Sequence, residues 1–152
     1  MRAPYVMPQR ISAPSLTIAG SRATDRGMIM TLLQVALGGA IGAVLRFVAG
    51  LGVARLTGPA FPLGVLGVNV LGSFLMGAFV VFAFQRDMQQ LGPLMMTGLL
   101  GGFTTFSTFS LEAFMLYERG QIGAAGLYVV LSVCLSLMAI GLGVWLAREI
   151  WA

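Results

Sequence analysis

Four long apolar stretches, separated by short polar links, constrain the fold of this sequence more than any other feature. They run over about 31–54, 63–84, 93–117 and 121–146. Each is close to the ~20 residues that an α-helix needs to cross the hydrocarbon core of a bilayer. Backbone groups in that core must pair within their own segment, which favours helices. The sequence therefore predicts an all-α, polytopic membrane protein with four transmembrane helices.

The composition excludes several classes of protein. Only 9% of the residues are charged and 58% are hydrophobic, whereas a soluble domain is about 25% charged. The chain has no His and a single cysteine, Cys134, so it lacks the commonest catalytic base and cannot assemble a zinc or iron–sulfur site. No nucleotide-binding motif and no basic face for nucleic acid is present. We expect a protein of the membrane that is not an enzyme.

The first 27 residues differ from the rest of the chain. They are rich in proline and hydroxyl residues, and they carry four of the nine arginines, with Asp25 as their one acidic residue. No apolar core of a signal peptide occurs in them. Two interpretations stay open: a disordered basic extension, or an upstream start codon with the natural protein beginning at Met28 or Met30. The four-helix transmembrane domain is expected over 28–152.

The charges that flank the apolar stretches give no orientation bias. Short links make the four helices antiparallel neighbours, with both termini on one side. Arg86 and Arg148 flank that side, and Arg55 and Arg119 flank the other. Because flanking positive charge sets orientation, a balanced chain is expected to insert both ways up, and the two forms can pair as an antiparallel dual-topology homodimer. The arginines of the first 27 residues would shift the balance toward termini inside.

The third stretch is predicted to be interrupted in the membrane. Gly101 and Gly102 precede five hydroxyl residues within seven positions, a poor continuous helix; they are Thr104, Thr105, Ser107, Thr108 and Ser110. Carbonyls freed around 101–104 would suit a cation, and the hydroxyls beyond them would face an anion. In the alternative, the helix is continuous and the hydroxyls bond back to carbonyls of the preceding turn.

For other polar or aromatic side chains in the four stretches, the sequence allows two roles each. Phe106 and Phe109 lie three apart, so on a helix they share a face; their electropositive ring edges can stabilise an anion, or the rings simply pack in lipid or core. Asn69, the one asparagine of the sequence, either joins helices or donates to an anion.

A polar stripe recurs every four residues in the fourth stretch, at Tyr128, Ser132 and Ser136. It either lines a path or forms hydrogen bonds between helices. Arg46 lies two turns before the end of the first stretch and either snorkels to the interface or makes a vestibule positive. Glu112, one turn from the end of the third stretch, is an interfacial carboxylate or a partner of Arg46.

Small residues at a spacing of four predict close helix contacts. The pairs are Gly38 with Gly42, Ser73 with Gly77, and Gly98 with Gly102. Four helices are too few to surround a pore, so a transport function implies an oligomer.

Three segments resemble one known family. Gly101-Gly102-Phe103-Thr104-Thr105-Phe106-Ser107-Thr108-Phe109-Ser110, followed by Glu112, is similar to the signature of the Fluc (CrcB) fluoride channels. The segment from Gly38 to Arg46 resembles the first helix of that family, and the segment from Gly67 to Phe74 resembles its second. The resemblance covers about Met30 to Leu146.

The resemblance implies dual-topology homodimers in the bacterial inner membrane, with two separate fluoride pores. It assigns the fluoride path to Phe106, Phe109, Asn69 and the track Tyr128, Ser132 and Ser136, beside the hydroxyls Thr105, Ser107 and Thr108. It also implies a structural sodium ion at the dimer axis, held by the backbone carbonyls of Gly101 and Thr104. Arg46 and Glu112 match vestibule positions of the family.

The expected function is passive, selective export of cytoplasmic fluoride down its electrochemical gradient. One alternative is a small multidrug-resistance type proton-coupled exporter, which needs a carboxylate in the first helix; the stretch 31–54 has none. Another alternative is a non-transporting assembly subunit of the membrane, which would not need the glycine-hydroxyl motif, the phenylalanine pair and the polar stripe together.

Overall fold

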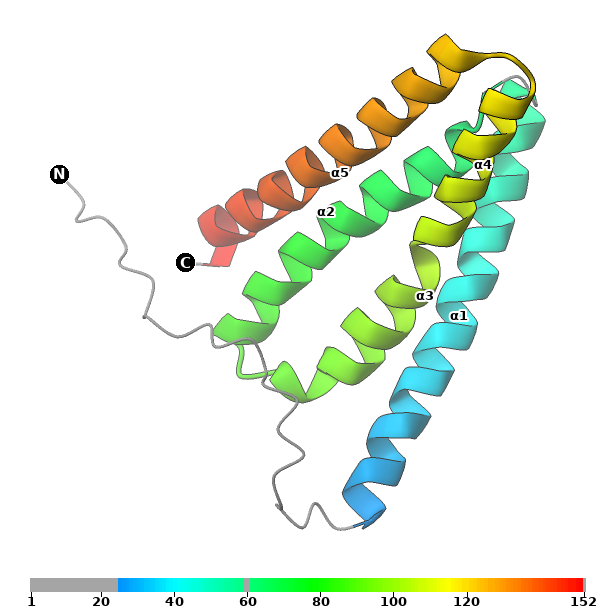
Figure 1. The fold of residues 1–152 in the computed structure, drawn as a ribbon. Helices are drawn as coiled ribbons and strands as arrows, with labels where there is room; N and C mark the ends of the chain where they lie inside the picture. The colour runs from blue at the N-terminus through cyan, green and yellow to red at the C-terminus, as the bar shows by residue number, and fades with distance from the viewer. Residues whose placement is uncertain (1–24, 59–60, 152) are drawn as a thin grey trace, which may run out of the picture.

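The computed structural model describes residues 25–58 and 61–151. Its elements are α1 (Asp25–Thr57), α2 (Leu63–Gln85), the 3-10 helix η1 (Gln89–Leu91), the π-helix η2 (Pro93–Leu100), α3 (Gly101–Phe103), α4 (Phe106–Glu118) and α5 (Ile122–Trp151). Figure 1 shows them as long, side-by-side helices. The predictions for residues 1–24, including the two interpretations of the basic extension, lie outside the described residues.

The predicted all-helical, four-span architecture is confirmed. Four helical segments are long and apolar enough to cross a membrane: Gly27–Thr57, Leu63–Gln85, Gln89–Glu118 and Ile122–Trp151. The first of them extends beyond the expected apolar stretch at both ends, and the last extends beyond its stretch at the C-terminal end, where the helix continues through Arg148 and Glu149 to Trp151.

The segments alternate in direction, so the bundle has two distinct ends (Figure 1). The terminal end holds the start of α1, the link after α2 and the end of α5; the loop end holds the α1–α2 and α4–α5 links. Gly58 and Gly120 have φ of +74° and +73° at the loop end, a conformation that suits glycine. Arg86 and Arg148 lie toward the terminal end, and Arg55 and Arg119 toward the loop end.

Helix α1 meets the first half of the third span backbone to backbone. A Cβ atom added to Gly38 would stand 2.3 Å from the carbonyl oxygen of Leu94 and 2.9 Å from the Cα of Gly98. One added to Gly42 would stand 2.1 Å from the carbonyl oxygen of Leu99. The small residues predicted to allow close contact therefore face each other across this interface.

Helices α2 and α5 pack by the same principle. A Cβ added to Gly77 would stand 2.3 Å from the carbonyl oxygen of Ile140, and one added to Gly143 would stand 2.2 Å from that of Phe74. Small residues in membrane helices permit such approach, and dispersion contacts between backbones then hold the pair. This places two polar residues of α5, Ser132 and Ser136, beside α2.

The third span changes partner in the middle of the bundle. Thr104 has ψ of 156°, and Thr105 has φ of −153° and ψ of 121°, so both residues are extended between α3 and α4. We refer to them as the extended pair. On one side of it, η2 and α3 pack on α1; on the other side, α4 packs on α5.

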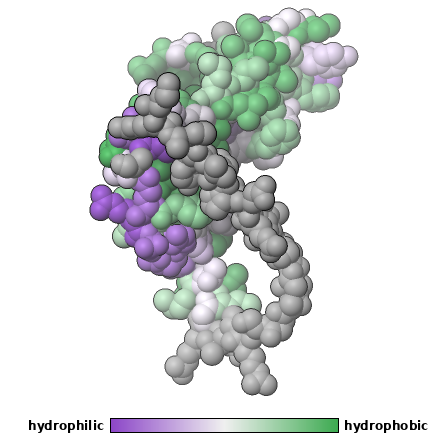
Figure 2. Space-filling model, turned by 90° about the vertical axis from the view of Figure 1, so that its left-hand side faces the viewer, coloured by the Kyte–Doolittle hydropathy of each residue, from purple (hydrophilic) through white to green (hydrophobic). Residues whose placement is uncertain are grey.

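Most of the apolar surface is not buried within the protomer. Only 11% of the most apolar window of α1 is buried, and 17% of that of α5. Figure 2 shows hydrophobic residues over much of the surface in view, with hydrophilic residues gathered in one patch. A surface of this kind is stable only against lipid or a partner.

Candidate functional site

The extended pair opens onto a groove between α2, α4 and α5. The groove has a volume of about 350 Å³. Its lining comes from α2 (Asn69, Gly72, Ser73 and Met76), from the third span (Thr104, Thr105, Phe106 and Phe109) and from α5 (Ser132, Val133, Ser136, Leu137 and Ile140). No Asp, Glu, Arg or Lys stands among these lining residues. The structure thus brings the predicted asparagine, phenylalanine pair and serine stripe together around one space.

Asn69 pairs with both main-chain groups of Thr105. Its Oδ1 accepts the Thr105 amide proton at 2.8 Å, and its Nδ2 donates to the Thr105 carbonyl oxygen at 3.1 Å. These two bonds fix which way the carboxamide is turned, since only one assignment of oxygen and nitrogen fits both. One Nδ2 proton is left over on a side chain that lines the groove. Asn69 therefore joins two helices, and its role toward an anion stays a prediction.

Some hydroxyl residues around the extended pair bond back to carbonyls of the preceding turn, and others do not, so each of the two alternatives drawn from the sequence applies to part of the segment. Thr104 donates to the Leu100 carbonyl at 3.0 Å and Ser110 to that of Phe106 at 2.9 Å, as in back-bonded helices. Thr105 instead caps α4: its Oγ1 accepts the Thr108 amide proton at 3.2 Å.

The cap continues into a cluster of hydroxyls. The Oγ1 of Thr105 donates to the Oγ1 of Thr108 at 3.2 Å and lies 3.1 Å from the Oγ of Ser107. Because these hydroxyls bind one another and the Thr108 amide in the first turn of α4, the cluster fixes the start of that helix. Their predicted contact with an anion stays a prediction.

Phe106 and Phe109 contact each other but divide between surface and core. Their ring centroids are 5.3 Å apart, while Phe106 is 78% exposed and Phe109 only 7%. Phe109 also lies 5.5 Å from the ring of Tyr128, which meets Phe61 edge to face at 5.6 Å. A row of four rings therefore leads from the lip of the groove toward the loop end.

The predicted stripe on α5 lies in the interior. Tyr128 is completely buried and donates its hydroxyl proton to Oε2 of Glu112 at 2.7 Å, a contact between α5 and α4. Ser132 is 5% exposed, and its Oγ has no hydrogen-bond partner among the residues that the structure describes. A buried hydroxyl without a partner is unfavourable, so the Ser132 hydroxyl is available to donate to an acceptor in the groove.

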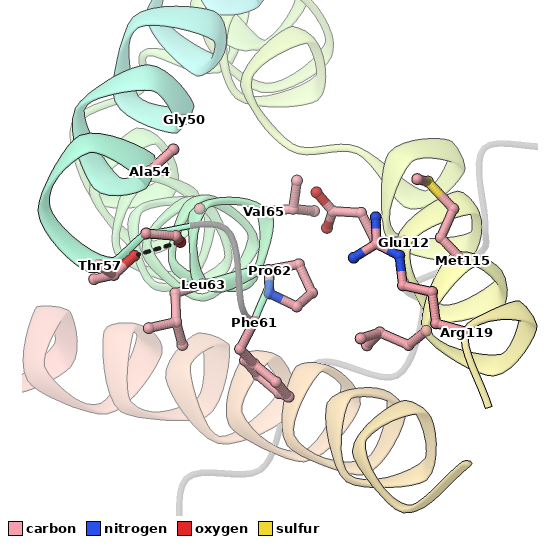
Figure 3. A pocket seen from close by; sticks show the side chains of 13 residues that line it. Gly50, Ala54, Thr57, Phe61, Pro62, Leu63, Val65, Glu112, Met115 and Arg119 are labelled. Carbon is pink, nitrogen blue, oxygen red and sulfur yellow. Dashed lines mark hydrogen bonds between the residues drawn. The ribbon is translucent and has the colours of Figure 1, made fainter. Parts of the chain in front are cut away.

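A second cavity of about 350 Å³ lies at the loop end. We call it the mouth pocket. Figure 3 shows Glu112 and Arg119 on one side of it, with Phe61 and Pro62 from the α1–α2 link nearby. Tyr128 stands between the two cavities, because it contacts Phe109 of the groove and Glu112 of the mouth pocket.

Sequence reasoning missed Arg119 and Phe61 as members of a site. Arg119 entered only the count of flanking charges, and Phe61 lies in a link without any motif, so neither carried a signal of its own. Arg46 lines neither cavity. Within the described residues it forms no ion pair with Glu112, whose hydrogen-bond partner is Tyr128.

The extended pair also alters the carbonyls before it. In a continuous α-helix the Thr105 amide would donate to the Gly101 carbonyl, but here it donates to Asn69. The Gly101 oxygen therefore loses its α-helical partner, and Gly101 lies at the protomer surface. Main-chain oxygens are hard donors suited to an alkali cation, so Gly101 and Thr104 fit the cation that the resemblance implies.

Comparison with known proteins places the chain in a family. A sequence model described as "CrcB-like protein, Camphor Resistance (CrcB)" matches residues 33–144. The "Fluoride-specific ion channel FluC" of Ruegeria sp. (strain TM1040) is 59% identical over 124 residues, which cover 81% of this chain and 98% of that protein. A protein of the same name from Rhizobium etli (strain CIAT 652) is 50% identical over 125 residues, 81% of this chain and 99% of its own length. The family resemblance indicated by the sequence motifs is thereby confirmed, and the chain belongs to the CrcB-like family.

Proposed function

We propose that this protein is a passive, fluoride-selective channel of the plasma membrane, as the names of its relatives suggest. One observation carries the proposal: within the described part of the chain, a groove lined by no charged side chain brings together a carboxamide, a buried hydroxyl without a hydrogen-bond partner and two phenyl rings. Fluoride is small and strongly hydrated, so a pore must replace its water with closely spaced donors. The protein catalyses no chemical reaction. Its pore lowers the free energy that is needed to replace the water around the ion by protein donors.

In this proposal, the donors lie one after another along the groove. The free Nδ2 proton of Asn69 and the hydroxyl of Ser132 replace water at the level of the extended pair, with Ser136 beside them. The electropositive ring edges of Phe106 and Phe109 then accompany the ion toward Tyr128. Because no fixed cation lines the groove, the ion is held weakly enough to leave, and its gradient sets the direction of flow.

The working unit of the proposal is an antiparallel homodimer with two pores. Phe106 lines the groove and is 78% exposed in the protomer. A pore for a hydrated anion cannot border lipid, so a second copy must complete the wall. With the first 27 residues and Arg46 left out, the arginines at the two ends of the bundle are balanced, two against two, which supports insertion in both orientations.

The proposal includes a structural sodium ion at the dimer axis. The Gly101 and Thr104 carbonyls of two antiparallel copies would supply about four hard oxygen donors. When bound, the ion would satisfy these oxygens and raise the local positive potential. Exchange of sodium for a bulky organic cation should abolish flux and lower the thermal stability of the dimer; unchanged flux and stability would contradict the site.

Fluoride efflux from liposomes tests the function directly. Purified protein is reconstituted in vesicles loaded with potassium fluoride or potassium chloride, and efflux is followed with ion-selective electrodes after addition of valinomycin. We expect rapid fluoride efflux and no chloride efflux above that of empty vesicles. Efflux that depends on a proton gradient would favour the exporter class, although residues 27–57 of α1 carry no carboxylate. Absence of any flux would favour the assembly-subunit class.

Reporter fusions test the dual topology. A chain that begins at Met28 should show activity of C-terminal reporters on both sides of the membrane, whereas the full-length chain should shift toward termini inside because of its additional arginines. A single orientation of the shorter chain would contradict the antiparallel dimer.

A further inference from the structure

We propose that Asn69 and Gly72 of α2 form a receptor for the extended pair, and that Asn69 acts on fluoride conduction as a positioning residue. The receptor holds Thr104 and Thr105 extended and thereby sets where α4 and its phenylalanines begin. The inference rests on the proposed channel function, because it concerns the geometry of the fluoride path. It assigns to Asn69 a duty that an anion donor alone would not have.

The first argument is the two-bond pairing. The carboxamide of Asn69 presents an acceptor and a donor side by side, as a peptide group does, and it binds the amide and carbonyl of one residue, Thr105, at 2.8 and 3.1 Å. Thirty-six positions separate the two residues in the sequence. Unpaired backbone groups are strongly unfavourable inside a membrane, so Asn69 makes an extended residue tolerable at this depth.

The second argument is the space at Gly72. A Cβ atom there would stand 2.3 Å from the Cγ2 atom of Thr104 and 3.3 Å from the Cδ1 atom of Phe103. Gly72 lies three residues after Asn69, so both occupy one face of α2. The absence of a side chain at Gly72 admits Thr104 to the surface of α2, while Asn69 holds Thr105.

The third argument is what the extended pair controls. Thr105 is the N-cap of α4 and accepts the Thr108 amide proton, so its backbone fixes the axis of the helix. Phe106 is the next residue, and its ring lies 5.3 Å from that of Phe109. If Asn69 releases Thr105, the cap and both rings shift together, although neither ring is hydrogen-bonded to Asn69.

An amide-to-ester substitution at Thr105 separates positioning from direct donation. Replacing Thr105 by its α-hydroxy acid removes the amide proton that Asn69 accepts, yet leaves both side chains intact. We expect this ester and Asn69→Ala each to lower fluoride flux in liposomes at least about tenfold, the effect of about 1.4 kcal/mol at one step. The two combined should lower it little further, because both remove the same link.

The matched control is the same ester at Thr97, an exposed residue of η2. It also removes a main-chain donor of the third span, but one remote from Asn69, so its effect should be small and should multiply with that of Asn69→Ala. Wild-type flux in the Thr105 ester, or independent effects of the ester and Asn69→Ala, would overturn the positioning role.

Amide hydrogen exchange provides a readout that does not require conduction. In protein labelled with 15N-threonine, the Thr105 amide should be protected in the wild type and should exchange at least about tenfold faster in Asn69→Ala and Gly72→Ala. Thr108 should lose protection with it. If the wild type conducts no fluoride, the proposed function fails, while protection of Thr105 still supports the receptor. A freely exchanging Thr105 amide in the wild type overturns the receptor whatever the flux.

Discussion

The two halves of the third span share one chain segment but are held in different ways. Its first half, η2 and α3, packs against α1 through glycines, with main-chain atoms of both partners in contact. Its second half, α4, packs against α5 through side chains, including the Tyr128–Glu112 hydrogen bond and the ring contact of Phe109 with Tyr128. The extended pair separates them.

This difference shows how a rigid support and a polar path can coexist in one helix-sized segment. Backbone contact between glycines leaves no room for side chains, so the first half serves as an anchor, and none of its residues from Pro93 to Phe103 lines either of the two cavities described above. The second half contacts its neighbour through side chains, and its phenylalanines line the groove. Substitutions that lie on the two sides of the extended pair should therefore fail in different ways.

The largest effect is expected from Gly42→Ala. Its Cβ would stand 2.1 Å from the Leu99 carbonyl oxygen, and neither backbone can move without parting α1 from the anchor half. We expect a loss of at least about 3 kcal/mol in unfolding free energy, the upper range for overpacking, together with low yield of folded protein. Thermal unfolding in detergent measures it.

Gly39→Ala is the matched control for this anchor. A Cβ at Gly39 meets no atom within 4 Å, and alanine is about 0.5–1 kcal/mol more favourable than glycine inside a helix. The Gly39 variant should thus be as stable as the wild type or more so. Equal stability of the Gly42 and Gly39 variants would show that the glycine contact does not support the first half.

The next largest effect is a loss of fluoride conduction by a protein that still folds. Phe109→Ile and Phe106→Ile remove the ring edges from the second half and should each reduce fluoride efflux at least about tenfold, equivalent to about 1.4 kcal/mol, while the dimer persists in size-exclusion chromatography. Phe114→Ile is the control, because Phe114 is exposed on the same helix and lines neither cavity. Wild-type efflux in either groove variant would argue against ring edges as part of the path.

A smaller effect is expected from Tyr128→Phe at the boundary between groove and mouth pocket. It leaves the ring contacts in place but deprives Glu112 of its donor, which should reduce stability by about 1–3 kcal/mol. Fluoride efflux should fall by a few-fold, less than with loss of a ring. Tyr117→Phe, on the exposed side of α4, should change neither quantity. If Tyr128→Phe leaves stability unchanged, the hydrogen bond does not contribute to the interface of α4 with α5.

The smallest effect is expected from Ser132→Ala. The Oγ of Ser132 has no hydrogen-bond partner within residues 25–58 and 61–151, so its removal should leave stability unchanged or raise it slightly. Efflux should decrease only modestly, because Ser136 and water can take over part of the donation. Differential scanning fluorimetry and the electrode assay measure the two effects. A stability loss above about 1 kcal/mol would mean that the hydroxyl is bound within the protein after all.

Much of this protein follows from its sequence alone. Hydrophobic stretches of bilayer length dictate four helices. A helix pairs its backbone groups within its own segment, and unpaired backbone groups are strongly unfavourable in lipid. The glycines at a spacing of four indicated close packing, and the motif from Gly101 to Glu112 indicated the family. These features are local and periodic, so they can be read from the order of residues.

Other properties arise only when segments distant in sequence come together. From the sequence, two roles were possible for Asn69: joining helices or donating to an anion. Its pairing with Thr105 depends on how α2 lies beside the third span. Phe106 and Phe109 share a face by spacing, yet Phe106 is exposed and Phe109 is buried, because of the two only Phe109 packs against Tyr128 of α5. Arg119 and Phe61 became parts of a cavity through the meeting of two links at the loop end. Hydrophobicity and periodicity set which elements form, whereas burial, hydrogen-bond partners and cavities depend on contacts between elements, and those are decided by the tertiary structure.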